Sequence, residues 1–227
     1  MRPGRNRRDF LRISLGRAAA LSLGPRRAAG APRQAPASRT GATSSRLSDT
    51  LVHVSGAGGN VVALRGPDGL VLANSGAPGR TADLIAALGQ VFPGATVTTV
   101  INSDWHPAHT GGNEVLADAG AQIIAHEHTK QYLGADIFVD WEEQIYKARP
   151  ASALPTTTFY TTGELIVADE RIEYGHLGQA HTDSDIYVYF RKANVLVAGD
   201  ALSVHRYPIA DYTTGGWLGG LATATKT

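Results

Sequence analysis

The sequence predicts an α+β fold in which two sheets pack together and helices cover their outer faces. In this chain of 227 residues, short β-rich runs with glycine turns come first, helical segments follow, and a second group of β-rich runs comes after them. Apolar residues make up 43% of the composition, which is enough for an ordinary hydrophobic core. Cysteine is absent, which excludes disulfides, iron–sulfur clusters and cysteine-ligated zinc.

Charge is divided unevenly along the chain. Residues 1–46 contain 11 Arg and one acidic residue, so residues 47–227 keep 10 basic and 19 acidic residues and a net charge of −9. An acidic body gives no electrostatic support for binding nucleic acid. No segment reaches the roughly 20 uninterrupted apolar residues of a membrane span. We therefore expect neither a nucleic-acid partner nor a stable membrane span.

The basic arm has the order of parts of an export signal. Residues 6–12 read Asn-Arg-Arg-Asp-Phe-Leu-Arg, an apolar stretch follows at residues 13–23, and an Ala- and Pro-rich segment continues to about residue 45. This order resembles the bacterial twin-arginine signal, which implies the twin-arginine export machinery as a partner and a periplasmic or secreted protein. A disordered basic tail is the alternative. We assign the signal and a flexible linker to residues 1–46 and the domain to residues 47–227.

The first half of the domain is predicted to be an antiparallel meander followed by alternating helices and strands. Glycine-rich turns at residues 56–59 and 66–69 separate the first three strands. Apolar residues at helical spacing and a closing Pro-Gly predict the first helix, and a β-branched run predicts a buried strand after it. The expected strands are 51–55, 60–64, 70–74, 96–101 and 122–125; the expected helices are 80–92 and 112–119 and one that starts within 126–133; residues 102–110 form a loop.

The second half supplies another sheet. Residues 138–162 are rich in Pro, Thr and aromatic residues without a clear period, so we expect a long, partly ordered insertion there. Four β-rich runs follow at 164–168, 171–177, 185–190 and 195–198. Residues 218–226 have the composition of a helix, and no strand follows it.

The residues that carry chemistry cluster after the buried strand. Asp104, His106 and His109 lie within six residues, where a loop can turn closely spaced side chains onto one ion. His181 and Asp200 lie at two later junctions between a loop and a strand. Imidazole nitrogen combined with carboxylate oxygen suits zinc, and without cysteine also iron or manganese. The spacing therefore predicts a metal centre.

These segments resemble the metallo-β-lactamase superfamily. The loop from residue 104 to Asn113 is similar to its His-x-His-x-Asp-His loop with the following Thr-Gly-Gly-Asn, and the segments Ala180-His-Thr-Asp183 and Ala198-Gly-Asp200 follow in the order of that family. The resemblance covers about residues 47–227 and implies an αββα sandwich with a metal site at one edge of the sheets. It assigns His106 and His181 to a first metal, His109 to a second metal, and to Asp200 a bridging or second-metal role that is also catalytic.

Departures from the family pattern qualify this assignment. Asp104 stands at the position of the first His, Ala108 at that of an Asp, and Asn74 at that of another Asp. The last helix and strand of the family, with a further His ligand, are expected to be missing because the chain ends first. We therefore expect Asp104 to join His106, His181 and Asp200 around one zinc ion. Only His109 and Asp200 would then remain for a second ion, which we expect to be weak or absent.

The resemblance implies a hydrolase. A metal-bound hydroxide would attack the ester, thioester or lactam carbonyl of a small-molecule substrate, with Asp200 as the catalytic carboxylate. Two alternatives stay open: a catalytically impaired relative that acts as a binding module or has no activity, and an oxidoreductase with an iron pair. Asp183 and Asp185 are expected to shape a turn, and His126 and His128 to start a helix or line the pocket.

Overall fold

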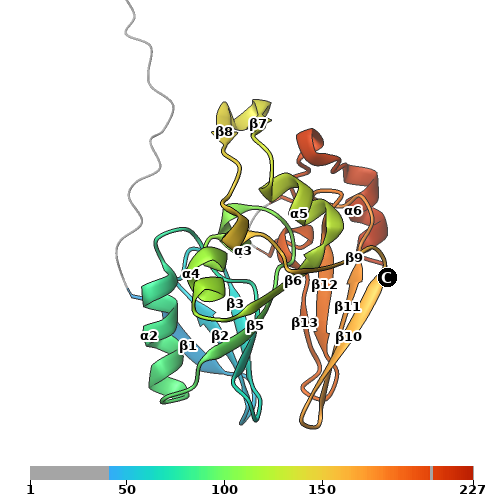
Figure 1. Cartoon of the computed structure of the whole chain (residues 1–227). Coiled ribbons are helices and arrows are strands. Elements are labelled where there is room, and N and C mark those ends of the chain that lie inside the picture. The colour runs from blue at the N-terminus through green and yellow to red at the C-terminus, as the bar shows by residue number, and fades with distance from the viewer. Residues whose placement is uncertain (1–40, 205–206, 227) are drawn as a thin grey trace, which may run out of the picture. The chain divides into compact units, whose positions relative to one another are not determined.

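The structure is a computed structural model that describes residues 41–204 and 207–226 (Figure 1). The predicted export signal lies almost wholly outside these residues, so it stays a prediction. The described residues belong to one compact unit built around two sheets. The α+β fold class expected from the sequence is confirmed.

The larger sheet has seven strands in the order β1-β2-β3-β4-β5-β6-β9. The first four strands are antiparallel, and β5, β6 and β9 continue the sheet in parallel with β4. Parallel neighbours need helical crossovers, and the helices between β4 and β6 supply them. The strands are β1 Thr43–Arg46, β2 Leu51–Ser55, β3 Val61–Arg65, β4 Leu70–Ala73, β5 Val97–Ile101, β6 Gln122–His126 and β9 Thr157–Phe159.

Helices cover the outer face of this sheet. Leu84 and Leu88 of α2 pack with Leu72 of β4 and Leu116 of α4 in one buried cluster. Two shorter helices lie at the edge where these parallel strands end: α3 begins after the loop of residues 102–106 that follows β5, and α5 begins directly after β6. The helices are α2 Thr81–Val91, α3 Pro107–Thr110, α4 Asn113–Asp118, α5 Glu127–Leu133 and, near the C-terminus, α6 Leu218–Ala224.

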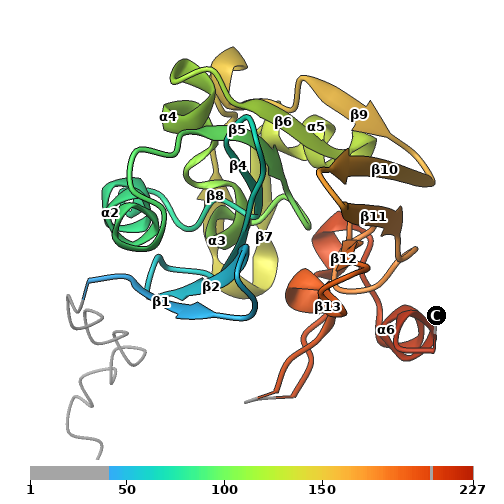
Figure 2. The same ribbon diagram turned by 90° about the horizontal axis from the view of Figure 1, so that it is seen from below.

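The smaller sheet is an antiparallel set in the order β10-β11-β12-β13. Its strands are β10 Thr162–Val167, β11 Glu170–His176, β12 Ile186–Phe190 and β13 Val195–Val197. Ile172, Val188 and Phe190 of this sheet are fully buried against Val71 and Ile124 of the larger sheet. The two inner faces therefore form a second hydrophobic core, and the two sheets lie face to face in Figures 1 and 2.

Two expectations from the sequence differ from the structure. The domain was expected to start at Leu47, yet β1 pairs with β2 along its whole length, so residues 43–46 belong to the sheet rather than to a linker. Residues 138–162 are also more ordered than expected. They contain a hairpin of β7 Ile137–Val139 and β8 Gln144–Tyr146, and then β9, which adds a parallel strand beside β6. Pairing with a distant strand decides such three-residue segments, and a local period does not reveal it.

The fold brings the chemistry-bearing loops to one edge. The segments after β4, β5 and β6 leave the carboxyl ends of parallel strands, which meet at the same edge of a sheet. The β11–β12 connection and the turn after β13 come from the smaller sheet, and side chains from both sheets meet there, as the contacts below show. In the described part of the chain, every helix is too short or too polar to cross a bilayer.

Candidate metal centre

The loop after β5 presents three of the predicted residues. Asp104 is fully buried, and His106 and His109 are nearly so. Oδ1 of Asp104 accepts a hydrogen bond from the backbone N–H of His106 (2.7 Å) and lies 3.3 Å from its Nδ1. Oδ2 of the same carboxylate lies 3.4 Å from Nε2 of His109, which α3 carries. One carboxylate thus lies between two imidazoles.

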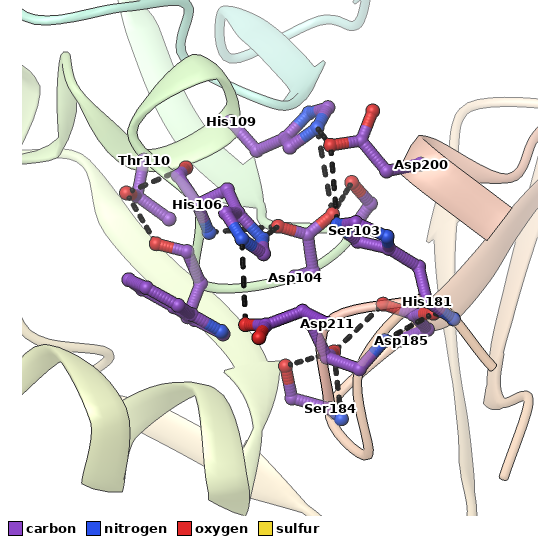
Figure 3. A network of polar contacts seen from close by, with 12 residues as sticks. Ser103, Asp104, His106, His109, Thr110, His181, Ser184, Asp185, Asp200 and Asp211 are labelled. Atoms are coloured by element: carbon purple, nitrogen blue, oxygen red, sulfur yellow. Dashed lines mark hydrogen bonds and ion pairs between the residues drawn. The ribbon is translucent and has the colours of Figure 1, made fainter. Parts of the chain in front are cut away.

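The smaller sheet supplies the other two residues. His181 lies in the β11–β12 connection, and Asp200 lies in the 3₁₀ turn Gly199–Ala201 after β13. Oδ2 of Asp200 is 3.2 Å from Nε2 of His109 and 3.8 Å from Nε2 of His181. Figure 3 shows the side chains of Asp200 and His181 reaching toward those of Asp104, His106 and His109. All five side chains proposed from the sequence therefore meet in one place.

The five residues form two overlapping groups. His106, His181 and Asp200 each offer a ligand atom within 4.8 Å of the other two, and so do Asp104, His109 and Asp200. The sequence assigned Asp104 to the first group and left His109 and Asp200 alone; the structure instead places Asp104 with His109. The reason is local. Asp104 turns back to accept the backbone N–H of His106, which directs its Oδ2 toward His109. Asp200 is common to both groups.

Outer contacts fix the orientation of the imidazoles. Nδ1 of His181 lies 2.8 Å from the carbonyl oxygen of Ile209, and because a carbonyl only accepts, Nδ1 donates and the neutral ring keeps a lone pair on Nε2. The ring of His106 stacks on Trp105, with centroids 4.2 Å apart, and its Nε2 lies 3.7 Å from Oδ2 of the buried Asp211. Metal-binding histidines in proteins are commonly oriented by a carbonyl or carboxylate at the second ring nitrogen, as the carbonyl of Ile209 does for His181.

Mutual attraction shifts the pKa values of the site. Burial raises the pKa of Asp104, but the charge of His109 and the hydrogen bond from His106 outweigh it and hold that pKa well below its ordinary value. Burial lowers the pKa of His109, while Asp104 and Asp200 raise it, with a net rise to about 9. Burial also raises the pKa of Asp200, and the neighbouring imidazole of His109 more than reverses this effect. A proton held by His109 must leave when this side chain binds a metal, so binding weakens as the pH falls.

The donor set fits a divalent cation. Both ring nitrogens of His109 are buried and make no hydrogen bond with any described residue, although two carboxylates lie close by. Buried polar atoms normally have partners, so an orphaned pair of this kind indicates a missing ligand. Nitrogen and carboxylate oxygen donors without sulfur match zinc, and also iron or manganese.

A buried amide pair anchors the metal loop. Nδ2 of Asn113 donates to Oδ1 of Asn102 (2.8 Å), and Nδ2 of Asn102 donates to the carbonyl oxygen of His109 (2.9 Å). Oγ of Ser75 also donates to that carbonyl (3.0 Å). Asn74, which stands where the family has Asp, accepts the backbone N–H of Ser103 (2.9 Å). An amide oxygen performs this task as a carboxylate would, because the partner is a neutral donor.

The turn that carries His181 is shaped by neighbouring acidic residues, as predicted. Oδ2 of Asp185 accepts the backbone N–H groups of His181 and Thr182, and its Oδ1 accepts the hydroxyl of Thr182 (2.8 Å). Burial, followed by the negative charge of Asp104, raises the pKa of Asp185 to about 8. Asp183 accepts the hydroxyl of Tyr132 through its Oδ1 (2.8 Å). Both acidic residues position the turn rather than joining either ligand group.

His126 has the helix-start role that the sequence left open. It is the N-cap of α5, and its Nδ1 accepts the backbone N–H of His128 (3.3 Å), while its Nε2 lies 3.2 Å from the carbonyl oxygen of Tyr160. Its ring stacks on His176, with centroids 4.0 Å apart. A proton on Nδ1 would abolish the cap. Burial and the neighbouring imidazoles of His176 and His128 lower the pKa of His126 to about 4.

The lowered pKa of His126 predicts that the fold loses stability in acid. The unfolded chain takes up a proton on His126 near pH 6.5 and the folded chain only near pH 4, so the unfolded state binds more protons in between. The free energy of unfolding is therefore expected to fall as the pH is lowered through this window. Urea titrations with EDTA present should show a smaller fall for His126→Asn, which keeps a capping side chain. Equal pH dependence in the two proteins would contradict this role of His126.

One residue of the site was missed by the sequence reasoning. Asp211 is fully buried beside His106, and its carboxylate accepts the hydroxyl of Thr214 and the backbone N–H of Thr213 (3.0 Å). The only local signal was an Asp followed by a tyrosine and two threonines, which is typical of a capped turn and does not indicate a metal site. Its proximity to His106 depends on the path of the chain after β13.

The fold and the site together define a class of protein: two packed sheets with a histidine and carboxylate centre at their common edge. The family model of the Metallo-beta-lactamase superfamily matches residues 54–225, and the chain belongs to this superfamily. Among solved structures, the chain is similar to the "Metallo-beta-lactamase from Pontibacter korlensis", with a TM-score of 0.62 and 17% identity over 82% of this chain and 83% of that chain. This likeness agrees with the αββα fold class implied by the sequence.

Proposed function

We propose that the protein is a zinc-dependent hydrolase that cleaves a carbonyl bond of a small molecule, namely an ester, thioester or lactam. The observation that carries the proposal is the convergence of three imidazoles and two carboxylates beside a cleft of about 580 Å³. His106, His109, His181 and Asp200 line this cleft, so an ion held by them would be within reach of a substrate. Membership of the superfamily supports metal-dependent hydrolysis as the general reaction.

Each side chain has a distinct task in this proposal. His106, His181 and Asp200 would hold one ion, and Asp104 and His109 would share Asp200 to hold a second one. A bound divalent ion lowers the pKa of its water to about 7 and polarises a carbonyl group. The side chain of Asp200 is 45% exposed, whereas that of Asp104 is fully buried. Because the pKa of Asp200 is held low, its carboxylate is charged at neutral pH and can orient the attacking water.

A metal-binding protein without turnover is the second candidate. Ala108 lines the cleft next to His109, where the family pattern places an acidic residue. A methyl group can neither bind a cation nor orient water, so the loss of this acid favours slow or absent chemistry.

One experiment separates the two candidates. The full chain is loaded with zinc, its metal content is measured by mass spectrometry, and hydrolysis is followed on p-nitrophenyl acetate and on panels of thioesters and lactams. The proposal predicts bound zinc and hydrolysis that EDTA abolishes and added zinc restores. Bound zinc without any turnover would favour the second candidate. A chain with neither bound metal nor hydrolysis would contradict both.

A further inference from the structure

We infer that Asp211 is a positioning residue of the metal centre: its carboxylate holds the proton on Nε2 of His106 and so leaves Nδ1 of that ring to bind the ion. The inference rests on the metal centre of the proposed function and adds to it a residue that belongs to neither ligand group. It comes from the contacts that residues 209–217, which directly precede α6, make with the two histidines of the first ligand group.

The ring of His106 lies between two fully buried carboxylates. Its Nδ1 is 3.3 Å from Oδ1 of Asp104, and its Nε2 is 3.7 Å from Oδ2 of Asp211. Asp104 belongs to a ligand group, so Nδ1 is the ring nitrogen on the side of the metal centre. A metal-bound imidazole keeps its proton on the other nitrogen, and the acceptor beside that nitrogen selects the tautomer. Asp211 is such an acceptor, and a hydrogen bond to it needs an approach closer by only about 0.5 Å.

A closed set of contacts holds the carboxylate of Asp211 beside this ring. Its Oδ1 accepts the backbone N–H of Thr213 (3.0 Å), and its Oδ2 accepts the hydroxyl of Thr214. The same hydroxyl oxygen accepts the Nε1–H of Trp105 (3.1 Å), and the ring of Trp105 stacks on His106. Figure 3 shows the carboxylate of Asp211 directed at the ring of His106. The contacts begin and end at His106, so a rotation of its ring or of the carboxylate would break contacts of both.

The same segment also holds His181 from outside the ligand group. The carbonyl oxygen of Ile209 accepts the Nδ1–H of His181, and the backbone N–H of Asp211 donates to the carbonyl oxygen of His181 (2.7 Å). In the turn that carries His181, the backbone N–H of Asp183 donates to the carbonyl oxygen of Thr214 (2.8 Å). One segment therefore contacts both imidazoles of the first ligand group, as expected of an element that positions metal ligands.

A role as a turn cap alone would not require a charged side chain. Oδ1 of Asp211 caps the turn by accepting the N–H of Thr213, and an asparagine oxygen does this equally well. In Asp211→Asn, however, the amide NH₂ would replace Oδ2 and present a donor to Nε2 of His106. A neutral ring whose Nε2 accepts from this amide carries its proton on Nδ1, the nitrogen that the ion needs. The two roles therefore predict different results for this variant.

The first test measures the zinc affinity of the full chain by competition with a chromogenic chelator. We expect Asp211→Asn to bind zinc about 10- to 100-fold more weakly, which is the usual effect of losing a group that orients a metal ligand. Glu170→Gln is the matched control. Glu170 is a buried carboxylate that accepts the backbone N–H groups of Lys192 (2.7 Å) and Ala193 (3.0 Å), and it belongs to neither ligand group, so its change should leave the zinc affinity as it is. Unchanged affinity in Asp211→Asn, or an equal loss in both variants, would overturn the inference.

The second test locates the proton on the imidazole of His106 and starts from the unchanged chain. In long-range ¹H–¹⁵N correlation spectra of the zinc-loaded protein, we expect the proton on Nε2 and zinc on Nδ1. Exchange of this proton with solvent should be faster in Asp211→Asn, because the acceptor that holds it is gone. A residue that only caps the turn would not change this exchange. A proton on Nδ1 with zinc on Nε2, or equal exchange in the two proteins, would overturn the inference.

The inference and the proposed function fail in different ways. Zinc binding that Asp211→Asn weakens, in a protein that hydrolyses no ester, thioester or lactam, would support the inference and contradict the hydrolase. Zinc-dependent hydrolysis with the same zinc affinity in Asp211→Asn would support the hydrolase and overturn the inference. A full chain that binds no zinc would overturn both.

Discussion

Replacing Asp200 with alanine is expected to remove most of the zinc affinity of the protein. This carboxylate is the one residue common to both ligand groups, so its loss leaves each group with two donors. Residues that only orient a metal ligand commonly cost 10–100-fold in affinity when changed, so we expect a loss of at least about 100-fold for Asp200→Ala. Competition against a chromogenic zinc chelator measures the change.

Asp68→Ala is the matched control. Asp68 lies exposed in the turn between β3 and β4, away from either ligand group. Its removal changes the net charge by the same amount as that of Asp200 and should leave zinc affinity within about twofold, since a distant surface charge is largely screened. Zinc binding by Asp200→Ala with unchanged affinity and stoichiometry would show that this residue does not hold the ion.

Gly111→Ala is expected to destabilise the protein by about 3 kcal/mol, the upper part of the usual range for overpacking. The φ angle of Gly111 is −63°, which any residue adopts, so backbone freedom is not the reason for a glycine here. The reason is space. A Cβ atom would lie 2.1 Å from the backbone nitrogen of Pro78 and 2.4 Å from the carbonyl carbon of Ala77. Either the backbone at Gly111 or the turn at Ala77 and Pro78 would have to shift to make room for the methyl group.

Gly89→Ala provides the control for this prediction. Gly89 lies in α2, is exposed, and has no atom within 4 Å of the position that an alanine methyl group would take. Alanine should therefore stabilise the protein there by up to about 1 kcal/mol through helix propensity. Urea unfolding of the metal-free proteins measures both changes. A Gly111→Ala variant as stable as the unchanged chain would contradict the close packing of this loop against Ala77 and Pro78.

The local patterns predicted most of the regular structure. Leu51–Ser55 and Val97–Ile101 are β-branched runs between turn signals, and the spacing of Leu84 and Leu88 indicates α2. By contrast, Thr157–Phe159 has no pattern of its own because its pairing with β6 makes it a strand. Helix α3 was missed because it is a single turn that begins at Pro107 within the expected loop.

The sequence predicted which residues form the candidate site but not how their side chains are arranged. The ordered motifs identified all five ligand candidates, since residues at the ends of neighbouring strands reach the same edge. They did not show that Asp104 turns toward His109, because this depends on one hydrogen bond to the backbone of His106. Asp211 was missed because residues 198–211 follow no period, and tertiary contacts alone bring it beside His106.

The central claim is that side chains from both sheets bind a divalent cation together. Anomalous diffraction from crystals of the zinc-loaded protein, collected on both sides of the zinc absorption edge, tests it most directly. We predict a zinc peak with His106, His181 and Asp200 as ligands at about 2.0–2.2 Å, and any second peak with Asp104, His109 and Asp200. Zinc bound only elsewhere, with these five side chains left without an ion, would contradict the account.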